Sequence, residues 1–143
     1  MKNNFIKNSF LNLIMFNGNK KTSEKLVIKS LKKLQKKFNQ KNFNDLIKIG
    51  LINSSPIFLV KNIKRKRKQT VEFPFLLNYK LRLFYGIKFI LRNCLNKQNQ
   101  KFYNKLEQEL VNSCNNLGQS VKIKKDLHKE AVVKKKFANY RWF

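Results

Sequence analysis

Apolar residues recur at three- and four-residue steps through the first third of the chain, the spacing of amphipathic helices. A first helix is expected over residues 4–16, ended at 17–19 because Asn and Gly accept the left-handed conformation. Thr22 or Ser23 is expected to cap a second helix, and a third follows over about 42–52. The expected inward-facing residues are Ile6, Phe10, Leu13, Ile14, Val27, Leu31, Leu34, Phe38, Phe43, Leu46, Ile47 and Leu51.

The pattern then changes to the two-residue alternation of strands. Residues 57–60 form an apolar, partly β-branched run, and Val71, Phe73 and Phe75 alternate with other residues. Between the two runs, 61–68 contains six basic residues in eight. We interpret the segment from about 56 to 76 as a β-ribbon with a basic tip. A disordered basic run is the alternative, and the flanking strands count against it.

Helical spacing resumes after Asn78. One helix is expected to reach about Leu95, a second to run from about 99 to 117 with Gly118 ending it, and a last to be capped by Asp126. No internal repeat or domain boundary is visible. The sequence therefore predicts a mainly α fold over 1–143, a single domain: about six helices in a helical body, with a protruding two-stranded β-ribbon between the third and fourth helices.

The net charge of the chain indicates what kind of partner it binds. The 143 residues include 33 Lys and Arg but only 7 Asp and Glu, a formal net charge of +26 with a pI near 10.4. Such a charge opposes compaction unless a polyanion neutralises it, and nucleic acid is the commonest polyanion. The chain is also 42% hydrophobic with 13 Phe, so it can form a core and is not merely a basic tail.

The candidate nucleic-acid contacts are spread over several elements. They lie around the first helix, in the turn after it, along the ribbon, on the next helix and before the last helix. This distribution suits folded RNA better than a single recognition helix in a DNA major groove. The candidates are Lys2, Lys7, Lys20, Lys21, Lys61, Lys64, Arg65, Lys66, Arg67, Lys68, Lys80, Arg82, Lys88, Lys122, Lys124, Lys125, Arg141 and Trp142.

The sequence gives little support for catalysis, metal binding or membrane insertion. The acids are scattered, no phosphate-binding Gly-rich loop occurs, and His128 has no evident nucleophile nearby in sequence, so we expect no enzyme, catalytic residue, cofactor or small-molecule substrate. Cys94 and Cys114 stand apart and fit apolar helix faces as small buried residues, so no metal site is expected. The longest apolar stretch, 81–91, contains two cations, so no membrane partner is expected.

Several segments resemble the family of small-subunit ribosomal protein seven, in the right order over nearly the whole chain. The stretch 10–25, FLNLIMFNGNKKTSEK, resembles the family's first helix, its "DGKK-ST-AEK" turn and second helix. Residues 110–118 look like its "LLDAANNRG". The segments DLHKE (126–130) and FANYRW (137–142) resemble its closing "DTHRMAEANRAFAHYRW". The ribbon differs, since its tip carries Lys and Arg where the family usually has paired glycines.

The resemblance implies binding to the 3′ major domain of small-subunit rRNA, with contacts on Lys20, the ribbon and Arg82. It also implies a role in nucleating the head of the subunit, beside neighbouring head proteins and close to tRNA and mRNA at the exit site. A histone-like protein that compacts DNA is the alternative, because it would share the charge.

The composition, dominated by Lys, Asn, Phe and Ile, looks like a very A+T-rich coding sequence. Together with the Trp142-Phe143 ending, which resembles mitochondrial members of the family, it favours a mitochondrial ribosome, with a plastid ribosome as the alternative. The first residues, 1–4, lack the Arg- and Ser-rich character of an import sequence, so we expect a protein encoded in the organelle.

Overall fold

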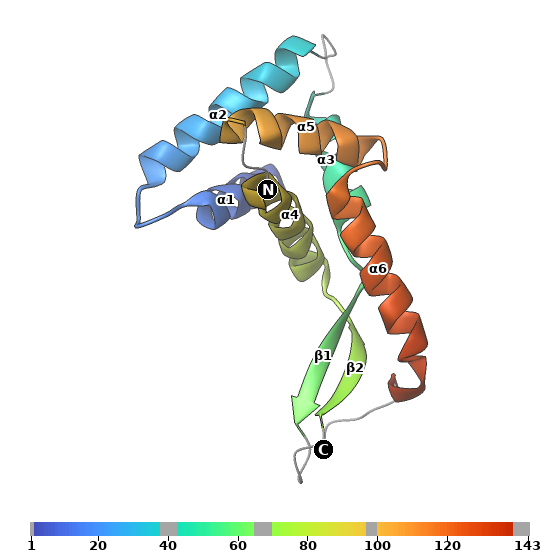
Figure 1. The fold of residues 1–143 in the computed structure, drawn as a ribbon. Helices are drawn as coiled ribbons and strands as arrows, with labels where there is room; N and C mark the ends of the chain where they lie inside the picture. Colours follow the sequence, from blue (N-terminus) through green and yellow to red (C-terminus); the bar gives the residue numbers. More distant parts are fainter. Residues whose placement is uncertain (1, 38–42, 65–69, 97–99, 139–143) are drawn as a thin grey trace.

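The computed structural model describes residues 2–37, 43–64, 70–96 and 100–138, and confirms the expected order of three helices, a ribbon and three helices (Figure 1). The elements are α1 (Lys2–Ile14), α2 (Lys20–Lys37), α3 (Phe43–Ser54), β1 (Phe58–Lys64), β2 (Thr70–Leu76), α4 (Tyr79–Asn96), α5 (Phe102–Cys114), α6 (Gln119–Val133) and the short 3-10 helix η1 (Lys135–Phe137).

The core of the helical body surrounds α4, which packs against α1, α3, α5 and α6. Ile87 and Ile90 of α4 are fully buried, and Leu51 of α3 and Leu106 of α5 pack in the same cluster. Phe10 and Leu34 bring the first two helices into it. The helical periodicity therefore identified the faces that fold together. Cys94 is buried as expected, whereas Cys114 is only half-buried and donates its thiol to the Leu46 carbonyl.

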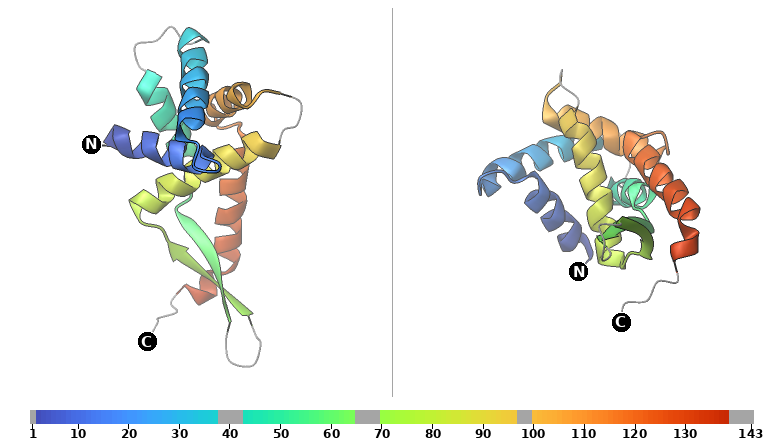
Figure 2. Two further views of the ribbon diagram at one scale, coloured as in Figure 1. Left: turned by 90° about the vertical axis from the view of Figure 1, so that its left-hand side faces the viewer. Right: turned by 60° about the horizontal axis from the view of Figure 1, so that its bottom comes forward.

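The ribbon projects from the body, and α6 runs alongside it (Figure 2). The two strands are antiparallel, with Lys61 opposite Phe73 and Lys64 opposite Thr70. Phe73 is 6% exposed, whereas Val71 and Phe75 are only half-buried, so Phe73 is the one residue of the alternating set in β2 that is fully packed. Contrary to expectation, residues 61–64 belong to β1 and not to the tip, because a cationic side chain leaves the backbone hydrogen bonds of the ladder unchanged. The candidate tip residues 65–68 lie outside the described residues.

The expected cap of the second helix is wrong. Asn17 and Gly18 both have positive φ, 52° and 73°, and this tight reversal lets α2 begin already at Lys20. Thr22 and Ser23 lie inside the helix, and their hydroxyls donate back to the carbonyls of Asn19 and Lys20 at 2.7 and 2.8 Å.

The boundary between the last two helices also differs from expectation. α5 was expected to run to about Leu117 with Gly118 ending it, but it ends at Cys114 and is followed by Asn116 in the left-handed conformation, with φ 59°. Gly118 instead precedes α6, which begins at Gln119 and not near Asp126. A Cβ at Gly118 would lie 2.9 Å from Ser113 Oγ and 3.0 Å from Glu109 Oε1, so close packing requires the glycine here.

The N-terminus of α6 is capped from another helix. The buried carboxylate of Glu109, on α5, accepts hydrogen bonds from the Ser120 backbone N–H at 3.0 Å and from the Ser120 hydroxyl at 2.9 Å. Ser113 Oγ lies 2.8 Å from Ser120 Oγ in the same buried cluster. A carboxylate is favoured at the positive end of a helix dipole, so this contact sets where α6 starts and how it leaves the body.

Candidate nucleic-acid interface

Eight of the ten candidate cations whose side chains the structure describes lie on exposed surface. The exposed ones are Lys7 on α1, Lys20 and Lys21 in the first turn of α2, Lys61 on β1, Lys80 and Lys88 on α4, and Lys122 and Lys125 on α6. Lys122, Lys124 and Lys125 were expected before the last helix, but the early start of α6 places them within it. Lys2 lies in α1 and Lys64 ends β1. The candidates Arg65, Lys66, Arg67, Lys68, Arg141 and Trp142 fall outside the described residues.

The acids of the chain leave this positive surface uncompensated. Six of the seven acids have partners within the chain. The contacts are Asp45 with Lys48, Glu107 with Lys37, Asp126 with Lys129, Glu72 and Glu130 with Lys134, and Glu109 with Ser120. Among side chains that the structure describes, none of the candidate cations forms an ion pair with an acid. The exposed cations therefore remain available to an external anion.

Three basic side chains meet where the ribbon joins the body. Lys124 of α6 donates from Nζ to the carbonyls of Ile52 and Asn53 at 3.3 and 3.1 Å, satisfying the C-terminal end of α3. One turn later, His128 Nε2 accepts the backbone N–H of Ile57 at 3.0 Å. Arg82 of α4 is close enough to affect both groups electrostatically. Within the described part of the chain, its buried Nε makes no hydrogen bond.

Burial, together with the neighbouring positive charges, lowers two pKa values at this joint. Burial, and then the Arg82 guanidinium, lower the pKa of Lys124 below its usual value. Burial, followed by Lys124 and Arg82, lowers the pKa of His128. A neutral imidazole is also what the geometry requires, because Nε2 accepts a hydrogen bond and must lack a proton. An anion placed beside Arg82 would relieve the repulsion.

The joint predicts a pH dependence of folding. Since the pKa of His128 is lower in the folded protein than its ordinary 6.5, its neutral form stabilises the fold fully above 6.5. That contribution is lost as the pH falls through the folded pKa. We expect the melting temperature of the free protein to fall from pH 7.5 to 5.0 by less in His128→Gln, which keeps an acceptor and does not titrate. An equal fall in parent and variant would contradict this role.

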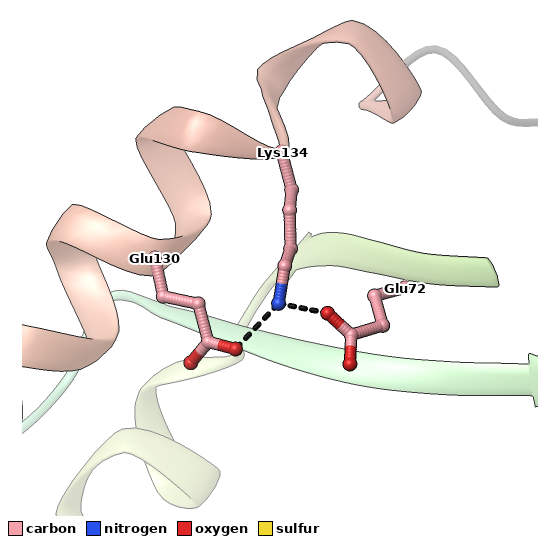
Figure 3. Close-up of polar contacts among 3 residues, drawn as sticks. All are labelled: Glu72, Glu130 and Lys134. Carbon is pink, nitrogen blue, oxygen red and sulfur yellow. Dashed lines mark hydrogen bonds and ion pairs between the residues drawn. The ribbon is translucent and has the colours of Figure 1, made fainter.

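A second joint ties the outer part of the ribbon to α6. Lys134, which follows α6, forms ion pairs with Glu72 of β2 and with Glu130 of α6 (Figure 3). Hydrogen bonds to Glu130 and then to Glu72 raise the pKa of Lys134, so it stays charged. Nearby, the rings of Phe73 and Phe137 pack edge to face with centroids 5.8 Å apart. The ribbon is therefore held at its base by His128 and farther out by Lys134 and Phe137.

Neither joint was predicted from the sequence. His128 lies four residues after Lys124, and Lys134 lies four after Glu130, so each pair shares a helix face that could have been noticed. Their distant partners, Ile57 and Glu72, are 71 and 62 residues away and carry no local signal. No group of three or more His, Cys, Asp or Glu in the described ranges could hold a metal ion. No helix there is both long and apolar enough to span a membrane.

Comparison with known proteins places this arrangement in a family. The family described as Ribosomal protein S7p/S5e matches residues 1–135. Small ribosomal subunit protein uS7 of Koribacter versatilis is 29% identical over 135 residues, covering 94% of this chain and 85% of its own. The uS7 protein of Wigglesworthia glossinidia brevipalpis is 29% identical over 140 residues, covering 98% and 88%. Small ribosomal subunit protein uS7m of Reclinomonas americana is 29% identical over 136 residues, covering 93% and 82%.

The match covers the helical body, the ribbon and α6, the same elements that carry the exposed cations and both joints. This agrees with the resemblance seen in the turn after the first helix and in the closing segment. The chain belongs to the ribosomal protein S7p/S5e family.

Proposed function

We propose that this chain, a structural ribosomal protein and not an enzyme, binds the 3′ major domain of small-subunit rRNA and nucleates assembly of the subunit head. The observation that carries the proposal is the distribution of charge. The candidate cations on α1, α2, the ribbon, α4 and α6 whose side chains are described have no acidic partner among the described residues, while six of the seven acids are engaged within the chain. RNA phosphates on several surfaces would supply the missing anions.

The proposal distinguishes three roles among the basic residues. Exposed cations such as Lys20 and Lys88 contact phosphates. Lys124 and His128 position the ribbon, because their polar atoms are already occupied by backbone groups of the body. Arg82 lies beside them, its buried Nε without a hydrogen-bond partner among the described residues, and places a phosphate at the base of the ribbon. The ribbon itself extends toward neighbouring head proteins and toward tRNA and mRNA at the exit site.

A mitochondrial ribosome is the proposed location. It is supported by the abundance of Lys, Asn, Phe and Ile, which indicates an A+T-rich coding sequence, and by the similarity to uS7m of Reclinomonas americana. Sedimentation of a lysate from the source cells, with detection by an antibody against this chain, tests the assignment. The chain should travel with small ribosomal subunits of the organelle. Its appearance with chromatin or nucleoid DNA instead would favour a DNA-compacting protein.

A further inference from the structure

A groove of about 760 Å³ lies between the outer part of the ribbon and the end of α6. Phe73 and Phe75 of β2 line it from the ribbon, and Val132 and Phe137 line it from the end of α6 and η1. Most of its surface is apolar, and Val132 is 70% exposed. Its volume falls within the roughly 300–1,000 Å³ of sites that bind small organic groups. It is therefore large enough for a nucleotide base.

The charges around the groove suit an anion. Its lining includes Lys61 and Lys135, both exposed, and contains no acid. Glu72 and Glu130, which are adjacent in sequence to the lining residues Phe73 and Ala131, are both paired with Lys134. Lys134 thus offsets part of the negative charge of these two carboxylates, which would otherwise repel a phosphate more strongly. Within the described residues, neither Lys61 nor Lys135 pairs with an acid.

One aromatic ring combines a stacking surface with a cation. Lys61 Nζ lies 4.4 Å from the centroid of the Phe75 ring, a cation–π contact on the surface of the ribbon. A base that stacks on Phe75 can displace the ammonium from the ring toward the phosphate of the same nucleotide. Single-stranded RNA is bound in this way, by aromatic rings under the bases and cations along the backbone.

We propose that this groove binds an unpaired, single-stranded RNA segment, with one base stacked on Phe75 and its phosphates held by Lys61 and Lys135. The inference rests on the proposed function and adds a site that recognises bases as well as phosphates. An unpaired segment is required, because bases within a duplex are stacked on each other and cannot reach the ring.

The test uses the full chain and fluorescent hexa-uridylate, with binding followed by anisotropy over a salt series. Phe75→Leu keeps an apolar residue and the net charge but removes the ring. It should weaken binding about 5- to 100-fold with an unchanged salt slope. Phe75→Tyr should bind like the parent. Lys61→Gln should lower the salt slope by about 0.7, the value for one contact to a single strand.

Phe16→Leu is the matched control, because Phe16 is 79% exposed and lies in the turn after α1, far from the groove in sequence and fold. Circular dichroism checks that each variant keeps its helicity. If Phe75→Leu unfolds the ribbon, Lys135→Gln on the exposed wall gives a second test, with the same loss of slope expected as for Lys61→Gln.

The proposal would be overturned if Phe75→Leu bound hexa-uridylate as tightly as the parent, or if Phe16→Leu weakened binding equally. An apolar segment of a neighbouring protein would then be the better candidate to occupy the groove. Unchanged salt slopes in both Lys variants would overturn the proposal as well. Such a failure is distinguishable from failure of the proposed function, because the parent would still bind a 3′-domain rRNA fragment selectively and with strong salt dependence.

Discussion

Replacing Lys64, Arg65, Lys66, Arg67 and Lys68 by Ser should weaken binding to a 3′-domain rRNA fragment by on the order of 100-fold at 0.1 M salt. Glu72 is the only acid between Asp45 and Glu107, and Lys134 already pairs with it. Lys64, at the end of β1, and the four tip cations therefore need an external anion. If each contacts a phosphate, the slope of log affinity against log salt should fall by about 0.7–0.9 for each cation removed.

A variant with the same loss of charge from the helical body provides the control. Lys25, Lys29, Lys32, Lys36 and Lys101 are exposed, belong to no ion pair with a described acid, and lie outside the candidate contacts. Changing these five to Ser should reduce affinity far less. Helicity by circular dichroism should match the parent in both variants. If the two variants bind alike, general charge and not the ribbon governs affinity.

Glu109→Ala should lower the free energy of unfolding by about 2–4 kcal/mol, a large fraction of the stability of a domain of this size. Glu109 is 1% exposed, and its Oε1 accepts both the N–H and the hydroxyl of Ser120. Its removal leaves the buried N–H of Ser120 without its acceptor and the Ser120 hydroxyl with only Ser113 Oγ as a partner, so the N-terminus of α6 loses its cap. Because α6 carries His128 and leads to Lys134, the ribbon should lose its support as well.

Thermal melting followed by circular dichroism measures this effect, with Glu109→Gln and Glu24→Ala as controls. Gln keeps an oxygen acceptor, so Glu109→Gln should lose clearly less than the Ala variant. Glu24→Ala also removes one acid from a chain of net charge +26 but leaves the α5–α6 junction intact, so it should change stability by less than about 0.5 kcal/mol. Equal destabilisation by Glu24→Ala would show that net charge, and not the buried cap, is responsible.

Periodicity was sufficient to predict the architecture because this chain has a simple pattern. Ile87, Ile90 and Leu106 recur at helical spacing and are buried, and Phe73 alternates with its neighbours and is buried. Few glycines and prolines interrupt these elements. The ribbon could be placed because the change from a period of 3.6 to a period of 2 occurs within a few residues.

Helix ends were harder to predict, since tertiary contacts decide them. Gly118 was expected to end a helix, as glycines often do, but it is needed for its lack of a side chain beside Ser113. The cap of α6 comes from Glu109 on another helix, 11 residues before Ser120, so no local capping signal exists. The start of α6, and with it the position of Lys122 and Lys125 on a helix, follows from that contact.

The sequence was enough to propose candidate cations, but it could not distinguish exposed cations from those that hydrogen-bond to the protein's own backbone. Lys88 and Lys124 look alike in a list of basic residues, yet Lys88 is exposed and Lys124 donates to the end of α3. This distinction depends on which backbone carbonyls lie near each lysine, and only the folded structure shows that.

We propose above all that the positive charge of this protein binds RNA. The most direct test of this proposal is the affinity of the purified chain for a 3′-domain rRNA fragment and for duplex DNA of equal length, each over a salt series. We expect the chain to bind the rRNA fragment more tightly than duplex DNA at every salt concentration, and to release about 5–10 counterions on binding the fragment. Equal or tighter binding to duplex DNA, or binding that salt does not weaken, would contradict it.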